Sequence, residues 1–288
     1  MAPQTTPSQS AQENSTRVLR SASREQPPLS PQKLFEEILH QVAEAQNFTE
    51  LVYHNVEPED GALVCKSLRA NKQVERRSCR INFNAFPGTL RVVVMPTEIH
   101  DVHQRWAIYS AGSWREDDLI TPDERYELCI GVGTTFTGFE GIYQGSSKEP
   151  DLFMRADVIE FPAIVIESGW SESFPYLRND KDVWMLGSSV VEVTILLKWT
   201  ELARKRVKGD IEVWRRDGSG GLTMEQHAIF PQPPHPLPGD RIEFTKQQLF
   251  KGSDISIANP GTTICLELST LRRMAKQLLT KRMGMQPA

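Results

Sequence analysis

Two short apolar runs, residues 161–167 and 190–199, constrain the fold of this chain more than any other feature. Both have the length and continuous hydrophobicity of strands that are buried on both faces of a sheet. Between them, Pro175 marks the first turn of a helix and Gly187 marks its end. A strand, a helix and a strand with short connections predict a right-handed parallel unit. We therefore expect an α/β protein with a central mixed sheet flanked by helices.

Helical and strand patterns continue on both sides of this unit. An amphipathic helix is predicted from Pro31, because Leu34, Ile38 and Val42 recur at helical spacing after a Ser30 cap. Its apolar stripe suits core packing or a homodimer contact. The other expected elements are strands at 80–83, 90–95 and 150–155, irregular strands in 127–139, a helix opening at Pro96 with Ile99, Val102, Trp106 and Tyr109 inward, a hairpin of 210–214 with 227–230, and a final helix at 268–282.

Composition divides the 288 residues into a tail and one domain. Residues 1–30 are rich in Gln, Ser, Thr and Pro, so we expect this N-terminal tail to be disordered. Residues 31–288 are expected to form a single domain, since 39% hydrophobic and 24% charged residues suit a globular protein with a core. The net charge of −4 argues against a general nucleic-acid coat protein and allows a local basic groove.

The sequence favours an intracellular protein of the cytoplasm or nucleus. No run approaches the roughly 20 apolar residues of a membrane span, so no membrane partner is expected. The N-terminus lacks the hydrophobic region of a secretory signal. Cys65, Cys79, Cys129 and Cys265 are scattered without CxxC spacing, which disfavours zinc and indicates free thiols. No P-loop, GxGxxG or GxSxG motif points to another chemistry.

Two acidic residues stand at strand ends in the central region. Asp151 begins the strand 150–155 and Glu167 ends the strand 161–167, so both converge at one sheet edge if the strands are neighbours. Paired carboxylates are hard ligands suited to Mg²⁺ or Mn²⁺, and such a metal ion activates water and stabilises charge on a phosphate. The alternatives are structural: Asp151 caps a turn after Pro150, and Glu167 accepts hydrogen bonds from the following turn.

The pair Pro150 and Asp151, followed after a gap by Val165, Ile166 and Glu167, resembles the core of the PD-(D/E)XK, or restriction-endonuclease-like, superfamily. Residues 145–151 and 163–173 are similar to Uma-type endonuclease-like proteins and to a group of uncharacterised fungal proteins. The resemblance spans residues 90–270. It implies a restriction-endonuclease-like core and a hydrolase, namely a magnesium-dependent nuclease that acts on DNA or RNA phosphodiesters.

One position departs from the family signature. The lysine two residues after the second acid is replaced by Gly169. The resemblance to the Uma-type group implies that a lysine on the following helix takes over. Lys181 shares a helical face with Leu177 and Trp184, and it is the candidate for contact with a phosphate or the attacking hydroxide. Alternatively, Lys181 extends past Trp184 to solvent or pairs with an acid.

Three further residues are accessory candidates, each with a structural alternative. Glu172 is either an extra metal ligand or part of a helix cap. His100 is either a base or phosphate contact, or an ordinary surface or core histidine. Glu98 is either an upstream acid or a glutamate favoured in the first turn of a helix by the helix dipole.

Two functions from different classes follow from these residues. The first is a metal-dependent nuclease in which Asp151, Glu167 and Lys181 are catalytic and both acids bind the metal ion. The second is a catalytically inactive member of the fold that acts as a binding or assembly protein and keeps the carboxylates as hydrogen-bond acceptors. The presence of both acids favours the first function. The missing lysine and the acidic net charge favour the second.

Overall fold

A mixed seven-stranded sheet forms the centre of the molecule. The computed structural model describes residues 16–20, 29–94, 98–170, 174–234 and 240–288. The strands are β5 (Leu128–Gly131), β6 (Leu152–Ala156), β7 (Ile164–Trp170), β8 (Val193–Leu202), β9 (Arg206–Arg216), β10 (Leu222–Phe230) and β13 (Gln286–Pro287). Their order is β10-β9-β8-β7-β6-β5, with β13 beside β9. β7 and β8 are parallel and are connected by α6 (Phe174–Leu186), so the predicted strand–helix–strand unit and the α/β class are confirmed.

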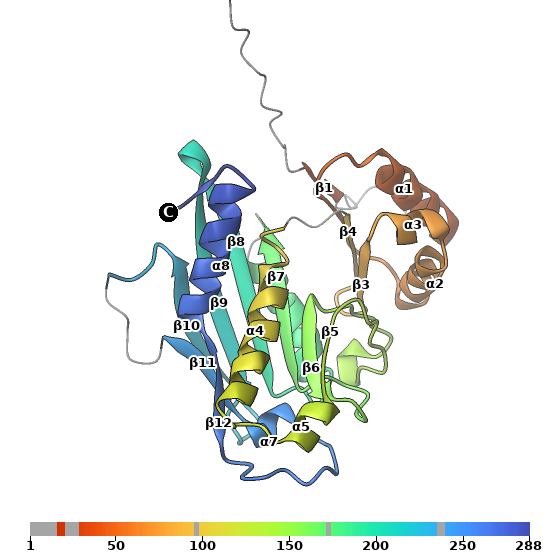
Figure 1. The fold of residues 1–288 in the computed structure, drawn as a ribbon. Helices are drawn as coiled ribbons and strands as arrows, with labels where there is room; N and C mark the ends of the chain where they lie inside the picture. The colour runs from red at the N-terminus through yellow and green to blue at the C-terminus, as the bar shows by residue number, and fades with distance from the viewer. Residues whose placement is uncertain (1–15, 21–28, 95–97, 171–173, 235–239) are drawn as a thin grey trace, which may run out of the picture.

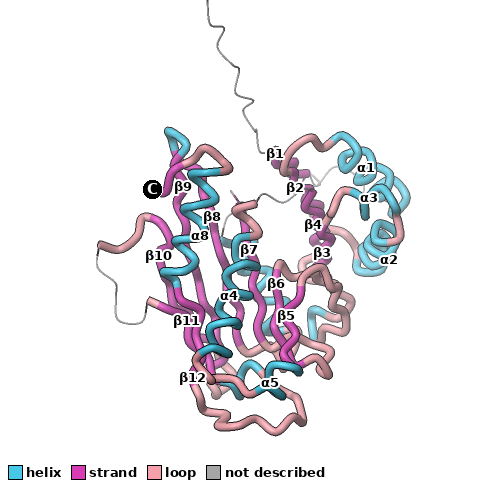
Figure 2. Tube along the Cα trace, viewed as in Figure 1, coloured by secondary structure: helices cyan, strands magenta, loops and turns pink. Residues whose placement is uncertain are grey.

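Helices cover both faces of this sheet. On one face, α4 (Val102–Glu116) and α8 (Leu268–Lys281) lie side by side, as Figures 1 and 2 show. Because side chains alternate along a strand, Ile166 of β7 joins the core beneath these two helices. Val165 points to the other face, where it shares a second apolar cluster with Trp184 of α6. Glu167 is two residues beyond Val165 and therefore belongs to the α6 face.

Residues 16–20 and 29–94 form a smaller unit, the N-terminal unit, with its own apolar core. Its sheet has the order β1-β2-β4-β3 and is covered by three helices, seen to the right of the main sheet in Figure 1. Leu51, Ile81 and Val92 point to that core, so the alternate residues of the same strands form the opposite face. The elements are β1 (Thr16–Arg20), α1 (Pro31–Glu44), β2 (Thr49–Tyr53), α2 (Pro58–Arg69), α3 (Lys72–Arg76), β3 (Arg80–Asn84) and β4 (Thr89–Val94).

Short elements complete the described fold. Strands β11 (Arg241–Thr245) and β12 (Thr263–Glu267) pair in an antiparallel ribbon. The others are α5 (Pro122–Glu127), α7 (Lys246–Leu249) and two 3₁₀ turns, η1 (Gly141–Tyr143) and η2 (Ala203–Lys205). Across the described ranges, no helix combines the length and the apolar character that crossing a membrane requires.

Most elements predicted from sequence periodicity are present. The helix after the Ser30 cap is α1, the strands at 80–83 and 90–95 correspond to β3 and β4, the hairpin is β9–β10, and the final helix is α8. The inward positions of Ile99, Val102 and Trp106 are also confirmed, because all three side chains are buried.

Three local predictions were wrong. α4 starts at Val102, so His100 lies in the preceding turn, and the predicted helix start at Pro96 falls outside the described residues. Tyr109 is 50% exposed, because its position on α4 points away from the sheet. β7 continues to Trp170 through pairing with β8, where a turn had been expected. The tail predicted to be disordered lies largely outside the described residues, except that residues 16–20 form β1 beside β2.

Candidate functional site

The segment 146–151 is buried between the N-terminal unit and the main sheet. Phe83 of β3 and Ser147 exchange backbone hydrogen bonds of 2.8 and 2.9 Å. The backbone N–H of Glu149 donates to the side-chain oxygen of Asn82 at 2.7 Å. These bonds hold the segment against β3, so Lys148 and Asp151 enter the junction between the two units.

Asp151 and Glu167 lie opposite each other on neighbouring strands. In the antiparallel pair β6–β7, Phe153 is paired with Val165. Continuing this register by two residues brings Asp151, just before β6, opposite Glu167. The convergence of the two acids expected from the sequence is therefore present. Both side chains are buried, with exposed fractions of 6% for Asp151 and 3% for Glu167.

Protein donors hold both oxygens of the Asp151 carboxylate. Oδ1 forms an ion pair with the Arg80 guanidinium, which comes from β3 of the N-terminal unit. Oδ2 accepts a hydrogen bond from the backbone N–H of Ser168 at 2.6 Å and lies 3.5 Å from Nε2 of His100. Burial raises the pKa of Asp151, but Arg80, His100, His103 and the Ser168 N–H outweigh it and lower the pKa to about 2. Asp151 is therefore a stable, internally paired anion.

Two histidines and a second acid lie around the ion pair of Arg80 and Asp151. Nδ1 of His100 lies 3.1 Å from Oδ1 of Asp101, and the same oxygen accepts from Arg80 at 3.0 Å. Nε2 of His103 lies 3.1 Å from the backbone oxygen of Asp151. Burial lowers the pKa of His103, and its Nε2 is placed to donate to that carbonyl, since a carbonyl oxygen only accepts. Thus His100, an accessory candidate from the sequence, does lie beside Asp151.

Glu167 has a different environment. Its Oε1 accepts a hydrogen bond from Nε1 of Trp184 at 2.6 Å and lies 3.8 Å from Nζ of Lys148. Burial raises the pKa of Glu167, and the negative charges of Asp151 and Asp180 raise it further. The Lys148 ammonium opposes this shift, and the resulting pKa is about 8. At neutral pH Glu167 is therefore mostly protonated.

Lys148 is the buried lysine that approaches Glu167, and no local sequence pattern pointed to it. Its side chain is fully buried and forms an ion pair with Asp180 of α6 as well as approaching Glu167. Asp180 in turn pairs with Arg91 of β4 at 2.7 Å. The only possible clue was its place in the segment that precedes Asp151, next to the charged Glu149.

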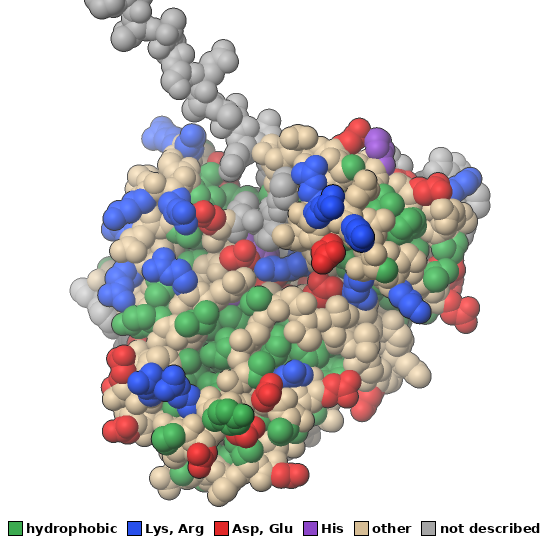
Figure 3. Space-filling view, turned by 45° about the vertical axis from the view of Figure 1, so that its right-hand side comes forward, with side chains coloured by type: hydrophobic (Ala, Val, Ile, Leu, Met, Phe, Trp, Pro, Cys, Tyr) green, Lys and Arg blue, Asp and Glu red, His purple; other side chains and the backbone are tan. Residues whose placement is uncertain are grey.

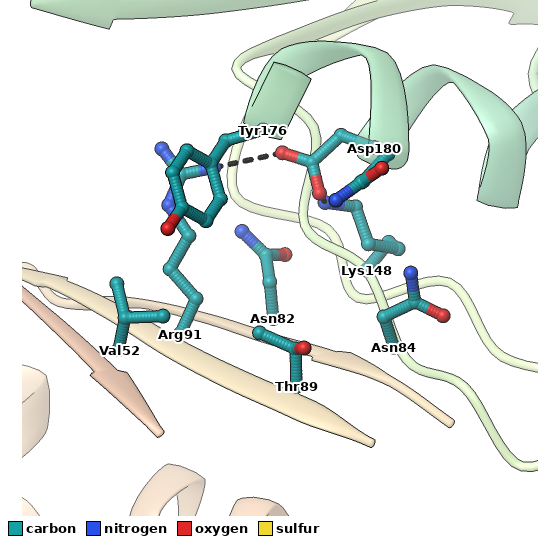
Figure 4. A pocket seen from close by; sticks show the side chains of 9 residues that line it. Val52, Asn82, Asn84, Thr89, Arg91, Lys148, Tyr176 and Asp180 are labelled. Carbon is teal, nitrogen blue, oxygen red and sulfur yellow. Dashed lines mark hydrogen bonds and ion pairs between the residues drawn. The ribbon is translucent and has the colours of Figure 1, made fainter. Parts of the chain in front are cut away.

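A polar pocket opens beside Lys148, between the sheet of the N-terminal unit and α6 (Figure 4). It encloses about 380 Å³ of empty space, including the part open to solvent. Strands contribute Asn82, Asn84 and Arg91, and α6 contributes Tyr176 and Asp180. The dashed line in Figure 4 is the Arg91–Asp180 ion pair, which joins the two walls of the pocket.

The other predicted site residues lie elsewhere. Lys181 is buried, but its Nζ pairs with Asp182 and lies 4.2 Å from the centre of the Trp214 ring. The described contacts of Lys181 thus connect it to neither candidate carboxylate. Glu98 is a surface residue paired with Arg282 at 3.1 Å. Glu172 falls outside the described residues.

The residues at the two carboxylates do not fit a divalent metal ion in this arrangement. Among the described residues, no group of three or more His, Cys, Asp or Glu side chains is placed to hold a metal ion. The cation beside Asp151 is the Arg80 guanidinium, and protein donors already hold Asp151 and Oε1 of Glu167. What the arrangement does is join two structural units through buried charge pairs.

Comparisons with known proteins add no relative. A scan against protein-family models and searches of curated proteins and solved structures found no match to this chain. The functional argument therefore depends on the residues and contacts described above.

Proposed function

We propose that this chain is a restriction-endonuclease-like domain that acts as a binding or assembly protein, with Asp151 and Glu167 as structural acceptors. The observation that carries this proposal is that both oxygens of Asp151 are held by Arg80, His100 and the Ser168 amide. Breaking such contacts to admit a metal ion would cost the buried Arg80 guanidinium its ion pair with Asp151 and leave it only the pair with Asp101, which is unfavourable.

The order of elements supports the fold proposal. An acid precedes β6, a second acid lies in β7, and a helix then leads to the parallel strand β8. This agrees with the resemblance seen at Pro150, Asp151 and Glu167. The glycine at position 169, where the family signature has lysine, supports loss of catalysis within that fold.

A second candidate function is a magnesium- or manganese-dependent nuclease acting on DNA or RNA phosphodiesters through Asp151, Glu167 and Lys181. One observation favours it: the two carboxylates are cross-strand neighbours at one end of β6 and β7. Lys148, which already approaches Glu167, would be better placed than Lys181 to assist. Nucleic acid as a partner, a homodimer and an intracellular location all stay predictions.

Calorimetry with Mg²⁺ and Mn²⁺ separates the two functions. The wild-type chain, Asp151→Asn and Glu167→Gln are titrated, and each is then incubated with DNA and RNA in the presence of metal. The exposed acids Asp123 and Glu201 provide matched controls, Asp123→Asn and Glu201→Gln. We expect no metal binding and no cleavage. Stoichiometric metal binding together with cleavage, both lost in the two site variants and kept in both controls, would establish the nuclease instead.

A further inference from the structure

The charged side chains of helices α4 and α8 are nearly all basic. Along their 15 and 14 residues, the only acidic side chain is Glu116, at the last position of α4. The whole chain, by contrast, has 37 Asp and Glu among 288 residues and a net charge of −4. The two helices pack against each other on the outside of the main sheet (Figure 1). Their shared outer face is called the α4/α8 surface below.

Exposed cations line the α8 side of this surface. Arg273, Lys276 and Lys281 are exposed, and α4 adds the exposed Arg105. Among the contacts of the described residues, Lys276, Lys281 and Arg105 have no acidic partner. Figure 3 shows Lys and Arg side chains gathered along one side of the main body, next to an area of hydrophobic side chains. Because exposed cations without partners attract an anion, the surface suits a negatively charged ligand.

Two large apolar side chains interrupt the cations. Ile108 is 64% exposed and Tyr109 is 50% exposed, both on α4. The Arg273 guanidinium lies 5.9 Å from the centre of the Tyr109 ring, so the charged and apolar parts form one continuous surface. Exposed aromatic and aliphatic residues beside arginine are typical of protein–protein contacts.

We propose that the α4/α8 surface binds an acidic amphipathic segment of a protein partner, whose carboxylates meet Arg273 and Lys276 and whose apolar side chains cover Ile108 and Tyr109. This inference rests on the proposed binding role and names its partner. Charge complementarity is the reason for the choice of an acidic ligand. The exposed apolar pair favours a peptide over a nucleic-acid backbone, because charged phosphates make no apolar contact with an isoleucine side chain.

Fluorescence anisotropy with a short labelled peptide of glutamate and leucine residues tests this inference on the full chain. We expect saturable binding that weakens with added salt, because screening acts on exposed charges. A peptide with glutamine in place of glutamate should not bind. The double variant Arg273→Glu with Lys276→Glu should weaken binding about tenfold or more, as should Ile108→Ser with Tyr109→Ser.

A matched control reverses two exposed lysines of the N-terminal unit, Lys66→Glu with Lys72→Glu, and should leave affinity unchanged. Equal loss in this control, or no binding by the wild type, would overturn the inference. So would tighter binding of a DNA or RNA oligonucleotide through Arg273 and Lys276 with no binding of the peptide. These results concern only the α4/α8 surface. The proposed function fails on a different result, namely metal binding at Asp151, so the two failures can be told apart.

Discussion

The surroundings of Asp151 and Glu167 differ sharply, although the two carboxylates face each other across neighbouring strands. Asp151 has a guanidinium, an imidazole and a backbone amide against its oxygens, and its pKa falls to about 2. Glu167 has an indole N–H and a more distant ammonium, and its pKa rises to about 8. Strand register therefore decides which acids meet, but the side chains from other elements decide whether each acid is charged.

Removal of Arg80, the cation beside Asp151, should cause the largest loss of stability. Arg80→Met leaves the buried Asp151 carboxylate without its cation, and we expect a loss of about 3–5 kcal/mol in the free energy of unfolding. Urea denaturation at neutral pH measures this loss. The double variant Arg80→Met with Asp151→Asn should recover part of it, and Arg125→Met, at an exposed site, should change little. A cost below about 1 kcal/mol would contradict a structural role for the pair.

Trp184→Phe should weaken the Glu167 side. It removes the indole donor of the 2.6 Å hydrogen bond to Oε1 and leaves a smaller ring, so we expect a loss of about 2–3 kcal/mol in unfolding free energy. Trp114→Phe is a matched control, because that buried indole donates to the backbone oxygen of Cys265 at 2.7 Å. Only the Trp184 variant should also raise the pKa of Glu167. A similar effect of both variants on that pKa would contradict the assignment.

Glu167→Gln should flatten the pH dependence of stability. Burial raises the pKa of Glu167 from its ordinary 4.5 to about 8, so between these values the folded chain keeps a proton that the unfolded chain releases. The Glu167 contribution to stability is therefore present below about pH 4.5 and lost as the pH rises to about 8. The slope is at most about 1.4 kcal/mol per pH unit. Denaturation from pH 5 to 8 should show this fall in the wild type and not in the variant.

Lys181→Met should have the smallest effect. The variant loses the pairing with Asp182 and the contact with the Trp214 ring, which we expect to cost less than about 1 kcal/mol of unfolding free energy. It should leave the pKa values of both carboxylates unchanged. Lys148→Met, at the buried lysine beside Glu167, should raise the pKa of Glu167 instead. An NMR titration measures these pKa values. If Lys181→Met raised the pKa of Glu167 and Lys148→Met did not, Lys181 would be the lysine of the site.

Sequence patterns anticipated the parts of the site that depend on local periodicity. The apolar runs identified β7 and β8, and their ends identified Asp151 and Glu167 as possible neighbours. The spacing of Lys181 with Leu177 and Trp184 left several positions open, and the structure has the alternative in which the lysine pairs with an acid, Asp182. Helical spacing does not say which neighbour a side chain reaches, however, and Lys181 lies against Trp214 instead of the carboxylates.

The partners that decide the chemistry were not predictable in the same way. Arg80 lies 71 positions before Asp151, in a different sheet with its own apolar core. Its contact depends on how the N-terminal unit packs against the main sheet, and no periodic pattern records that packing. Lys148 lies in an irregular segment whose position depends on backbone bonds to β3. Long-range packing of this kind determines pKa values but leaves little trace in local sequence.

The most direct test of the central claim is a carboxyl titration by carbon-13 NMR, with and without Mg²⁺. If Asp151 and Glu167 are structural acceptors, Asp151 titrates near 2 and Glu167 near 8, and saturating Mg²⁺ changes neither value. A metal ion held between the two groups would favour their ionised forms and lower the pKa of Glu167. A shift of Glu167 to its ordinary range on addition of Mg²⁺ would therefore contradict the account.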